Sequence, residues 1–465
     1  MANRKPAKRK ADQARLAAVR VLYQVLEEEA FSNESAAYHL ADPDLDARDR
    51  AFASALIFGT LGRLPAIDYF LGRVSKRPLK DLDPWVRTVL RAGVWQLFYS
   101  YQVTVPAACD ESVRLIRFLA GEKATGFVNG ILRKLAREKP KLTDPALEAG
   151  LPRPLFKLLS DWYGREEALE IGRASLLSPS LISIRPNGLR IEDFDRWSRT
   201  GEAEELELQK RGWPSPAYGL LPSGRSVTLT EGYRQGLYSL QSRAAMMVGC
   251  LAPAGPGDRI LDLCAAPGGK TGHLAEKAGP DSMITACDVS PDRLAVLEEA
   301  MERLGHDFVR TRLQDALIPV EDWEEAFDLV LCDVPCSGLG LMQKKPEIRL
   351  RVSSESIGRL MGIQADILQN AGRYVRPGGS LLYTTCTINP QENEDQVKAF
   401  LETDTGASFV LEDLSEEADM ELRGALPLPL SERLPGSLLF LPHRDQSDGF
   451  YIARLRKTGP NLTAL

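Results

Sequence analysis

Two cysteines in the second half of the chain have positions that suit covalent chemistry. Cys336 lies in a polar turn that begins at Asp333, directly after the apolar run 327–332, and Cys386 follows the apolar run 380–385. Such runs are typical of buried strands in a parallel sheet, whose carboxyl ends meet at one edge. The pattern therefore places both thiols at the edge where open α/β sheets have their sites.

Signals for a helix start follow Cys386. Asn389 is a preferred N-cap residue, Pro390 suits the first helical position, and Glu392 has the capping-box position three residues after the cap. Because the amino end of a helix favours negative charge, this arrangement predicts support for a thiolate at Cys386.

Ordinary burial is the alternative interpretation of these thiols, since Cys is among the residues most often buried. We interpret Cys250, Cys264, Cys287 and Cys332 in this way, as small apolar fillers. A zinc site could use Cys332 and Cys336, but a second ligand pair is missing and the four His are scattered along the chain. We therefore expect no metal.

A turn of small residues follows the first expected strand and opens a helix. It consists of Cys264, Ala265, Ala266, Pro267, Gly268, Gly269 and Lys270. Small residues let the backbone approach a ligand closely, so we assign the whole turn to cofactor binding. A Walker A loop would need Gly where Cys264 stands, and the Gly-x-Gly-x-x-Gly fingerprint is absent. Nucleoside triphosphates and dinucleotides are therefore disfavoured.

Three carboxylates follow three successive strands of the same expected sheet. Asp262 would repel a phosphate but suits an amino group, Asp288 can hold a ribose diol, and Asp315 can accept from an adenine amino group. Arg293, in the helix after Asp288, and Asp333, after the apolar run 327–332, are further candidates for cofactor binding. For each Asp, the alternative is a helix cap or a turn. A ligand with an amino acid, a ribose and an adenine but no phosphate is S-adenosyl-L-methionine, which we predict as the cofactor.

The elements that position these residues alternate between strands and helices from residue 236 onward. The expected strands are 260–263, 283–288, 308–313, 327–332 and 380–385, with helices starting near 273 and covering 292–304 and 354–375. This alternation predicts a Rossmann-like α/β domain with a parallel sheet.

The first third of the chain has a different pattern. Residues 11–138 show helical periodicity with Pro near the element ends, which predicts an all-α domain of five to seven helices. Residues 146–230 mix helical stretches with possible strands, among them 181–184. We therefore predict a multidomain protein, with an all-α domain over 1–145, a small α+β linker domain over 146–235 and a Rossmann-like domain over 236–465.

Composition limits the class of protein. The chain has 465 residues, 26% of them charged, and only 7 Cys, which fits a reducing cytoplasm rather than a disulfide scaffold. No stretch approaches the ~20 apolar residues that span a bilayer, so we expect no membrane contact. The net charge is −6, yet residues 1–150 carry +6, so a basic module precedes an acidic remainder. An anionic partner for that module is one interpretation, and a solvated helical surface is the other.

Three motifs carry a resemblance to a known family. The segments DLCAAPGGKT (262–271), DVPCSG (333–338) and TTCTINPQENE (384–394) resemble the RNA (cytosine-5)-methyltransferases of the Nop/Sun family, as does the closing DGFYIA (448–453). One departure is Gln-Ser-Arg-Ala-Ala at 241–245, where many relatives have Gln-Asp-x-Ala-Ser. This lost carboxylate puts the cofactor or RNA contacts there in doubt.

The N-terminal part is similar to NusB, an RNA-binding antitermination factor. The likeness rests on Arg48-Asp49-Arg50, Gly59, Ile67-Asp68, Leu90-Arg91, Val105-Pro106, Glu111 and 126–130. A NusB-like domain fused to such a methyltransferase resembles the bacterial family members that act on small-subunit rRNA. The resemblance therefore implies 16S rRNA as the partner, and we expect a monomer that does not act on DNA.

The resemblance also implies the roles of the site residues. Cys386 would attack C6 of cytosine, and Cys336 would help to release the product. Asp333, if protonated, would hydrogen-bond the base edge, and Lys270 would lie beside the base or the nucleophile. Methylation of tRNA and a non-catalytic RNA-binding role remain the alternatives. Candidate RNA contacts are the basic segments 4–10, 71–80 and 133–141.

Overall fold

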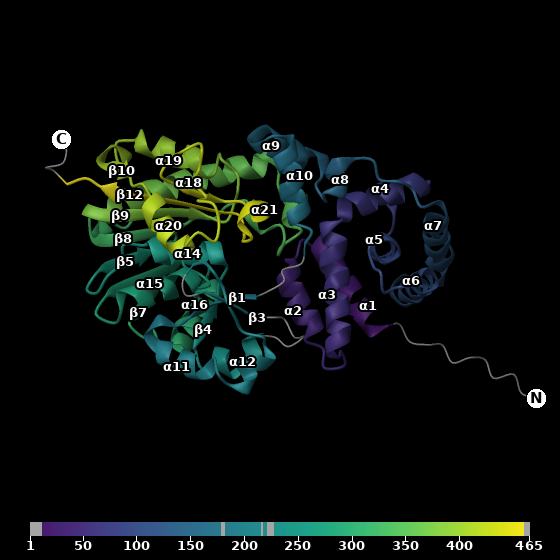
Figure 1. Ribbon diagram of the computed structural model, residues 1–465. Coiled ribbons are helices and arrows are strands. Elements are labelled where there is room, and N and C mark those ends of the chain that lie inside the picture. The colour runs from purple at the N-terminus through teal and green to yellow at the C-terminus, as the bar shows by residue number, and fades with distance from the viewer. Residues whose placement is uncertain (1–11, 178–181, 215–216, 221–226, 460–465) are drawn as a thin grey trace, which may run out of the picture. The chain divides into compact units, whose positions relative to one another are not determined.

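The computed structural model describes residues 12–177, 182–214, 217–220 and 227–459 (Figure 1). The chain forms two compact units. The first contains residues 1–178 together with 342–351, and the second contains 179–341 and 352–465. We call them the helical unit and the sheet unit. Within the described residues, no helix is long and apolar enough to cross a membrane.

The helical unit begins with seven α-helices, in agreement with the prediction of five to seven. They are α1 (Gln13–Glu27), α2 (Ser32–Leu40), α3 (Ala47–Gly62), α4 (Leu64–Val74), α5 (Pro84–Phe98), α6 (Val105–Ala120) and α7 (Thr125–Glu138), with short 3₁₀ turns η1 (Leu79–Asp81) and η2 (Glu122–Ala124). The unit continues with α8 (Pro145–Glu148), α9 (Arg153–Tyr163), α10 (Arg165–Ala174) and α17 (Ile348–Arg351).

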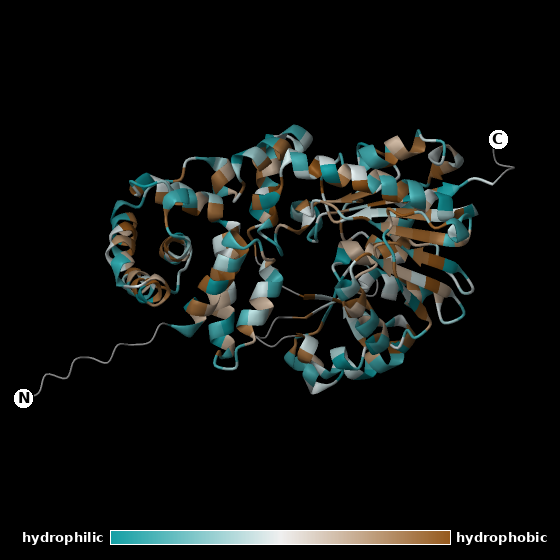
Figure 2. Cartoon of the chain, turned by 180° about the vertical axis from the view of Figure 1, so that it is seen from behind, coloured by the Kyte–Doolittle hydropathy of each residue, from teal (hydrophilic) through white to brown (hydrophobic). Residues whose placement is uncertain are grey.

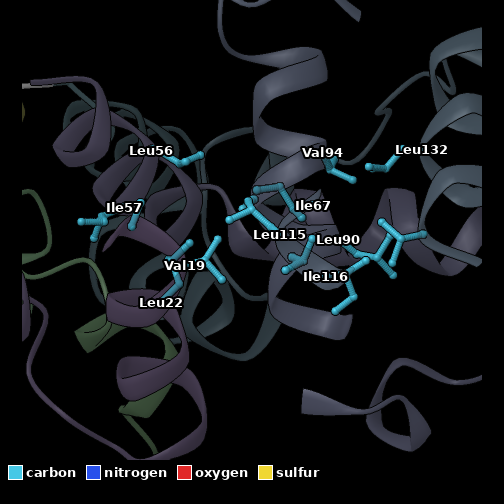
Figure 3. Close-up of a cluster of buried hydrophobic side chains, with 14 of the residues drawn as sticks. Val19, Leu22, Leu56, Ile57, Ile67, Leu90, Val94, Leu115, Ile116 and Leu132 are labelled. Atoms are coloured by element: carbon cyan, nitrogen blue, oxygen red, sulfur yellow. The ribbon is translucent and has the colours of Figure 1, made fainter. Parts of the chain in front are cut away.

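Local sequence explains where these helices start, and the core explains why they stay together. The side chains of Asp12, Asp46, Asp83 and Thr104 each accept a hydrogen bond from a backbone N–H in the first turn of the following helix. The apolar stripes of the helices then pack into one buried cluster, shown in Figure 3, that includes Val19, Ile57, Leu90, Ile116 and Leu132.

A segment from the second half of the chain completes the helical unit. Arg349 of α17 is buried, with 1% of its surface exposed. It donates to five carbonyl oxygens, those of Gly62, Gly150, Ser175, Met342 and Pro346. These contacts bring together residues up to 287 positions apart in the sequence.

The buried carboxylate of Glu347 ties the same segment to α2. It accepts hydrogen bonds from the backbone N–H of Ser32, at 3.0 Å, and from its hydroxyl, at 2.7 Å. These two buried charges could not be predicted from local sequence, because their partners come from distant parts of the chain.

The sheet unit begins with a small antiparallel sheet of order β2-β3-β1-β4. Its elements are β1 (Ile182–Pro186), η3 (Gly188–Arg190), α11 (Ile191–Trp197), α12 (Gly201–Glu205), β2 (Gln209–Lys210), β3 (Tyr218–Leu220), η4 (Val227–Leu229), α13 (Glu231–Arg234) and β4 (Tyr238–Leu240). Part of the strand expected over 181–184 lies outside the described residues, and β1 contains the rest.

The large sheet has eight strands, with the order β10-β12-β9-β8-β5-β6-β7 and with β11 paired to β12. The central strands are parallel, whereas β12 pairs antiparallel with β9, β10 and β11. The strands are β5 (Arg259–Asp262), β6 (Met283–Asp288), β7 (Val309–Leu313), β8 (Phe327–Asp333), β9 (Val375–Thr385), β10 (Phe409–Leu411), β11 (Leu438–Phe440) and β12 (Phe450–Lys457).

The chain reverses its direction of strand addition beside β5, because β6 and β7 extend the sheet on one side and β8 and β9 on the other. Ligands of open α/β sheets bind at such a switch point, outside the carboxyl ends of the strands. The helices of this unit are α14 (Arg243–Leu251), α15 (Gly269–Ala278), α16 (Pro291–Leu304), α18 (Ser354–Tyr374), α19 (Glu394–Leu401), α20 (Ser415–Leu422) and α21 (Pro442–Asp445), with short turns η5 (Glu321–Trp323), η6 (Leu339–Leu341) and η7 (Gly406–Ser408).

Burial follows this layered arrangement. Figure 2 shows the strands of the large sheet mostly in brown, the hydrophobic colour, whereas the helices alternate between brown and teal. A strand covered on both faces is apolar throughout, and a covering helix needs only one apolar stripe. The Rossmann-like architecture predicted from the sequence is confirmed.

The contacts divide the chain differently from the predicted domains. Helices α8, α9 and α10 belong with the helical unit, and the small sheet belongs with the large sheet. The predicted boundaries at 145 and 235 instead follow changes in sequence pattern, which need not coincide with packing. The three-domain division therefore stays a prediction.

Replacing Arg349 tests the role of the inserted segment. Arg349→Ala removes the donors from several buried carbonyl groups, so we expect the free energy of unfolding of the helical unit to fall by about 3 kcal/mol. Denaturant unfolding followed by circular dichroism measures this change. Arg137→Ala, whose side chain is 77% exposed, is the matched control and should have little effect. Equal stability of the two variants would contradict this role.

Candidate active site

The four predicted catalytic residues lie at the carboxyl edge of the large sheet. Asp333 is the last residue of β8, Cys336 follows in the next turn, and Cys386 comes directly after β9. The parallel register of β8 and β9, which pairs Asp333 with Thr384, brings these ends together. Lys270 is the second residue of α15 and reaches the same edge, as its contact with Asp333 shows.

The two thiols are in contact, with 3.3 Å between the Sγ atoms of Cys336 and Cys386. This contact and burial together raise the pKa of Cys336 well above its ordinary value. Cys336 therefore keeps its proton at neutral pH, and an S–H group is available to donate to Cys386. All seven cysteines are free thiols.

An ion pair lies beside the thiols. Lys270 Nζ is 2.5 Å from Asp333 Oδ2, and the Thr384 hydroxyl donates to Oδ1 at 2.9 Å. Burial alone lowers the pKa of Lys270, but the Asp333 carboxylate and the nearby Cys386 sulfur outweigh it, so the pKa is raised. Lys270 therefore stays an ammonium ion that favours negative charge on Cys386.

These contacts surround the carboxyl group to which the resemblance assigns a hydrogen bond with the base edge. Both carboxyl oxygens of Asp333 accept hydrogen bonds, one of them from a cation. The sequence could not show this, because Lys270 comes from a different strand–helix turn. The role of Asp333 at the base edge stays a prediction, and Lys270 is a second donor beside it.

A buried carboxylate joins the turns that carry the two cysteines. Glu392 accepts from the backbone N–H of Ser337 at 2.8 Å and from its hydroxyl at 2.5 Å. It also accepts from the side-chain amides of Asn389, at 2.8 Å, and Gln364, at 3.0 Å. Ser337 adjoins Cys336 in the sequence, so these bonds fix the first cysteine turn against the second.

This arrangement corrects the predicted helix start after Cys386. The helix α19 begins at Glu394, and Asn389 is not its N-cap. The Asn389 side chain instead accepts from Gln391 N–H at 3.0 Å and donates to Glu392. Because the helix starts later and Glu392 serves another purpose, the predicted support of a thiolate by a helix dipole was wrong.

The small-residue turn after β5 has the tight geometry expected of a ligand-binding loop. Gly268 has a φ of +98°, which disfavours any side chain, and a Cβ there would approach Met301 to 3.1 Å. Ala265 N–H donates to the Cys287 carbonyl at 2.8 Å, which ties the turn to β6. The positive φ and the close approach of Met301 therefore favour glycine at position 268.

Asp262 offers the best fit to a cationic ligand group. It is 1% exposed, and the Thr271 hydroxyl donates to Oδ2 at 2.7 Å. Its other oxygen, Oδ1, is buried without a hydrogen bond of normal geometry, although the Cys264 amide lies nearby. Burial raises the pKa of Asp262 to about 7. The ammonium group of an amino acid would satisfy this oxygen.

Asp288 and Arg293 brace the same turn. Asp288 accepts from Ala266 N–H at 3.3 Å and from Ser290 N–H at 3.0 Å. Arg293 lies 3.4 Å from Asp288 and donates to the Ala266 carbonyl at 2.6 Å. The two residues therefore have a structural role at the expected cofactor edge in addition to any contact with a ligand.

Asp315 has the turn role that was the alternative interpretation of its sequence position. Its side chain accepts a hydrogen bond from Leu317 N–H at 3.0 Å. Beside the expected ribose and adenine positions, two apolar side chains are unusually exposed, Val289 at 61% and Ile318 at 60%. The sequence analysis missed them. The available signal was that Val289 directly follows Asp288 and that Ile318 comes three residues after Asp315.

A buried arginine connects the small sheet to the start of α15. Arg185 of β1 pairs with Glu276 at 2.6 Å, donates to the Gly269 carbonyl at 3.0 Å and donates to Gln241. Both members of the ion pair are at most 5% exposed. Gly269 precedes Lys270, so this network positions the ammonium of the site. Sequence reasoning missed it, because the partners are 91 residues apart.

Three further cysteines of the sheet unit, Cys250 of α14, Cys287 of β6 and Cys332 of β8, have the neutral thiols expected of apolar fillers. Cys287 and Cys332 are fully buried, and burial raises the pKa of Cys250 and of Cys287 to about 12. Such thiols are neutral fillers. The part of the chain that the structure describes contains no group of three or more His, Cys, Asp or Glu that could hold a metal ion.

The structure describes two of the three basic segments that we predicted as RNA contacts. The segment 4–10 lies outside the described residues. In 71–80, Arg73, Lys76, Arg77 and Lys80 are exposed, and in 133–141 the same holds for Arg133, Arg137, Lys139 and Lys141. These side chains are accessible to an anionic partner.

Comparisons with known proteins agree with the geometry. Residues 248–456 match the family model described as 16S rRNA methyltransferase RsmB/F, and residues 12–137 match the NusB family. The chain is 30% identical to the probable ribosomal RNA small subunit methyltransferase B of Bacillus subtilis, over 95% of this chain and 98% of the relative. It is 33% identical to ribosomal RNA small subunit methyltransferase B of Xanthomonas campestris, over 96% and 97%.

Solved structures give the same result. The crystal structure of PH0851 has a TM-score of 0.79 and 26% identity, and the match covers 97% of this chain and all of that one. A methyltransferase homologue from Pyrococcus horikoshii has a TM-score of 0.56 and 27% identity, over 68% of this chain and 98% of that one. Membership of a methyltransferase family confirms the predicted methyl donor, S-adenosyl-L-methionine. The chain belongs to the RsmB/F family of 16S rRNA methyltransferases and carries a NusB domain at its N-terminal end.

Proposed function

We propose that the protein methylates C5 of a cytosine in 16S rRNA through a covalent bond between Cys386 and C6 of the base. The observation that carries this proposal is the contact of Cys336 with Cys386, 3.3 Å between the sulfurs, beside the Lys270 ammonium. C5 of cytosine is a poor nucleophile in the aromatic ring. A thiolate that adds at C6 breaks the aromaticity and makes C5 nucleophilic.

Each residue of the site would have one role in the reaction. Lys270 favours the thiolate of Cys386, whose sulfur forms a bond to C6. S-adenosyl-L-methionine, when bound, supplies the methyl group that the activated C5 receives. A base then removes the C5 proton, the S–C6 bond breaks with its electron pair returning to sulfur, and the aromatic ring is restored. Cys336, kept protonated by its surroundings, donates its S–H to the departing Cys386 sulfur.

The cofactor would be held by the groups at the end of β5 and β6. The unpartnered Oδ1 of Asp262 would take the ammonium group, and the backbone of 264–270 would line the amino acid portion. Asp288, braced by Arg293, would take the ribose diol. Asp315 and the exposed Val289 would flank the adenine.

The substrate must present an unpaired or flipped cytosine, because C6 is not accessible to a side chain inside a duplex. Basic side chains would supply much of the affinity through phosphate contacts, and binding should weaken steeply with salt. We also propose that the enzyme acts as a cytoplasmic monomer.

The same reaction on tRNA is the main rival, because the site residues do not distinguish the two RNAs. Bisulfite sequencing of total RNA from cells with and without the gene decides between them. Loss of one protected cytosine in 16S rRNA supports the proposal. If the protected cytosine is instead lost from tRNA, then tRNA is the substrate. If no RNA changes, the proposed activity is contradicted.

Replacing the nucleophile tests the covalent mechanism. Cys386→Ala should lower methyl transfer to RNA by more than about 1,000-fold, because C5 is then no longer activated. Transfer of a radioactive methyl group measures this change. Cys250→Ala, which removes a cysteine outside the site, should keep normal activity. Substantial methylation by Cys386→Ala would place the nucleophile elsewhere.

Replacing the second thiol tests its role in release. In Cys336→Ala the bond between Cys386 and C6 should form but break slowly, so an enzyme–RNA adduct should accumulate. Denaturing gel electrophoresis detects it as a slowly migrating band. The double variant Cys336→Ala/Cys386→Ala should show no band. Loss of activity in Cys336→Ala without any adduct would refute the release role.

The pH dependence of cofactor binding tests Asp262. Because its pKa is raised to about 7, the carboxyl is mostly protonated at lower pH and cannot pair with an ammonium. Affinity for S-adenosyl-L-methionine should therefore rise by up to about tenfold from about pH 5.5 to pH 7.5. Calorimetric titration measures this. Asp262→Asn should bind more weakly and lose the pH dependence, and an unchanged profile in that variant would exclude the contact.

A further inference from the structure

A pocket of about 810 Å³ opens in the helical unit, and none of its lining residues belongs to the candidate active site. It lies where the start of α1, the start of α3 and the connection between α5 and α6 come together. Its walls include four aromatic side chains and two arginines, namely Phe52, Trp95, Tyr99, Tyr101, Arg15 and Arg48. The volume falls in the range of about 300–1,000 Å³ that is usual for small-ligand sites. We call it the aromatic pocket.

The aromatic rings of the pocket are held in place by the helices behind them. Trp95 lies against the backbone of Gly59, where a Cβ would be only 2.3 Å from the indole nitrogen. The Arg63 guanidinium lies 4.5 Å from the centre of the Tyr99 ring. Rings fixed in this way lose little conformational freedom when a flat ligand stacks on them.

Tyr101 is the exception, because its side chain is fully exposed. It lies in the short connection between α5 and α6, where nothing in the fold requires an aromatic residue. A large exposed aromatic side chain beside a pocket is a frequent feature of binding surfaces.

The polar lining offers both donors and acceptors. Arg15 is already engaged, since it donates to Gln96 at 2.8 Å and lies 3.3 Å from Asp12. Arg48 and Asp49, neighbours at the start of α3, place a guanidinium and a carboxylate at the same wall. A phosphate site would present donors alone, and Asp49 would repel an anion. A nucleobase has both donors and acceptors on its edge and two faces for stacking.

We propose that the aromatic pocket binds one unpaired nucleobase of the RNA substrate by stacking, with Tyr101 as a principal platform. This inference rests on the proposed function only in naming RNA as the source of the base. It assigns a role to the Arg48-Asp49 motif, which the catalytic chemistry leaves unused. The site would select RNA that has a further unpaired nucleotide besides the target cytosine.

The test compares the full-length chain with variants at Tyr101, using a fluorescein-labelled single-stranded oligoribonucleotide and a blunt RNA duplex of equal length. Tyr101→Ala should weaken binding of the single strand by roughly 5- to 100-fold, the range for loss of one stacked base. Its affinity for the duplex should change less than about twofold. Tyr101→Phe keeps the ring and should restore binding. Fluorescence anisotropy measures the affinity of each protein for both RNAs.

Tyr38→Ala is the matched control, because Tyr38 is 78% exposed on the same unit but does not line the pocket. It should bind both RNAs as the unchanged protein does. The ratio between unchanged protein and Tyr101→Ala should also stay constant between about 50 and 200 mM salt, since stacking releases no counterions. Equal binding of the single strand by Tyr101→Ala, or no binding by the unchanged protein, would overturn the proposal.

Failure of this inference can be told apart from failure of the proposed function. If the unchanged protein methylates RNA and Tyr101→Ala binds the single strand equally well, the pocket proposal alone is wrong. If Tyr101→Ala loses single-strand binding while no RNA is methylated by the unchanged protein, the pocket proposal stands and the proposed activity is wrong.

Discussion

The geometry of the candidate site depends on one buried carboxylate, that of Glu392, which needs hydrogen-bond donors around it. Glu392 is fully buried, and an ionised group withdrawn from water is costly unless hydrogen bonds replace its hydration. Its four donors come from Ser337, Asn389 and Gln364, which lie on three separate segments. Meeting this requirement fixes the two cysteine turns against each other. The contact between the thiols follows from it.

The other acidic groups of the site divide into two kinds. Asp333 and Asp288 have partners within the chain, so they serve to orient Lys270 and the small-residue turn. Asp262 keeps one buried oxygen without a partner. An unsatisfied buried oxygen costs stability, and such costs are retained where a ligand compensates for them. Carboxylates whose oxygens all have hydrogen-bond partners in the chain therefore position the site, whereas Asp262, with one oxygen unpaired, is the carboxylate we expect to bind a ligand.

The helical unit also contains a buried charged group, here a cation, whose hydrogen-bond partners lie within the chain. Arg349 buries a guanidinium by donating to carbonyl groups at the ends of several helices, where carbonyls lack partners within their own helix. Its segment follows the catalytic turn in the chain and yet belongs to the helical unit by its contacts. The same unit carries a pocket whose aromatic walls depend on Gly59 and Arg63, residues that have no contact with RNA in our proposal.

The sequence by itself determined the class of fold, the helical character of the first third, the sheet edge and the identity of the thiols. These features depend on local periodicity and on residue type, which are read directly from neighbouring positions. It placed the start of the helix after Cys386 too early. Only the tertiary structure decided the partners of Glu392, Arg185 and Arg349, since hydrogen bonds of buried charges depend on segments that are distant in the chain and close in space.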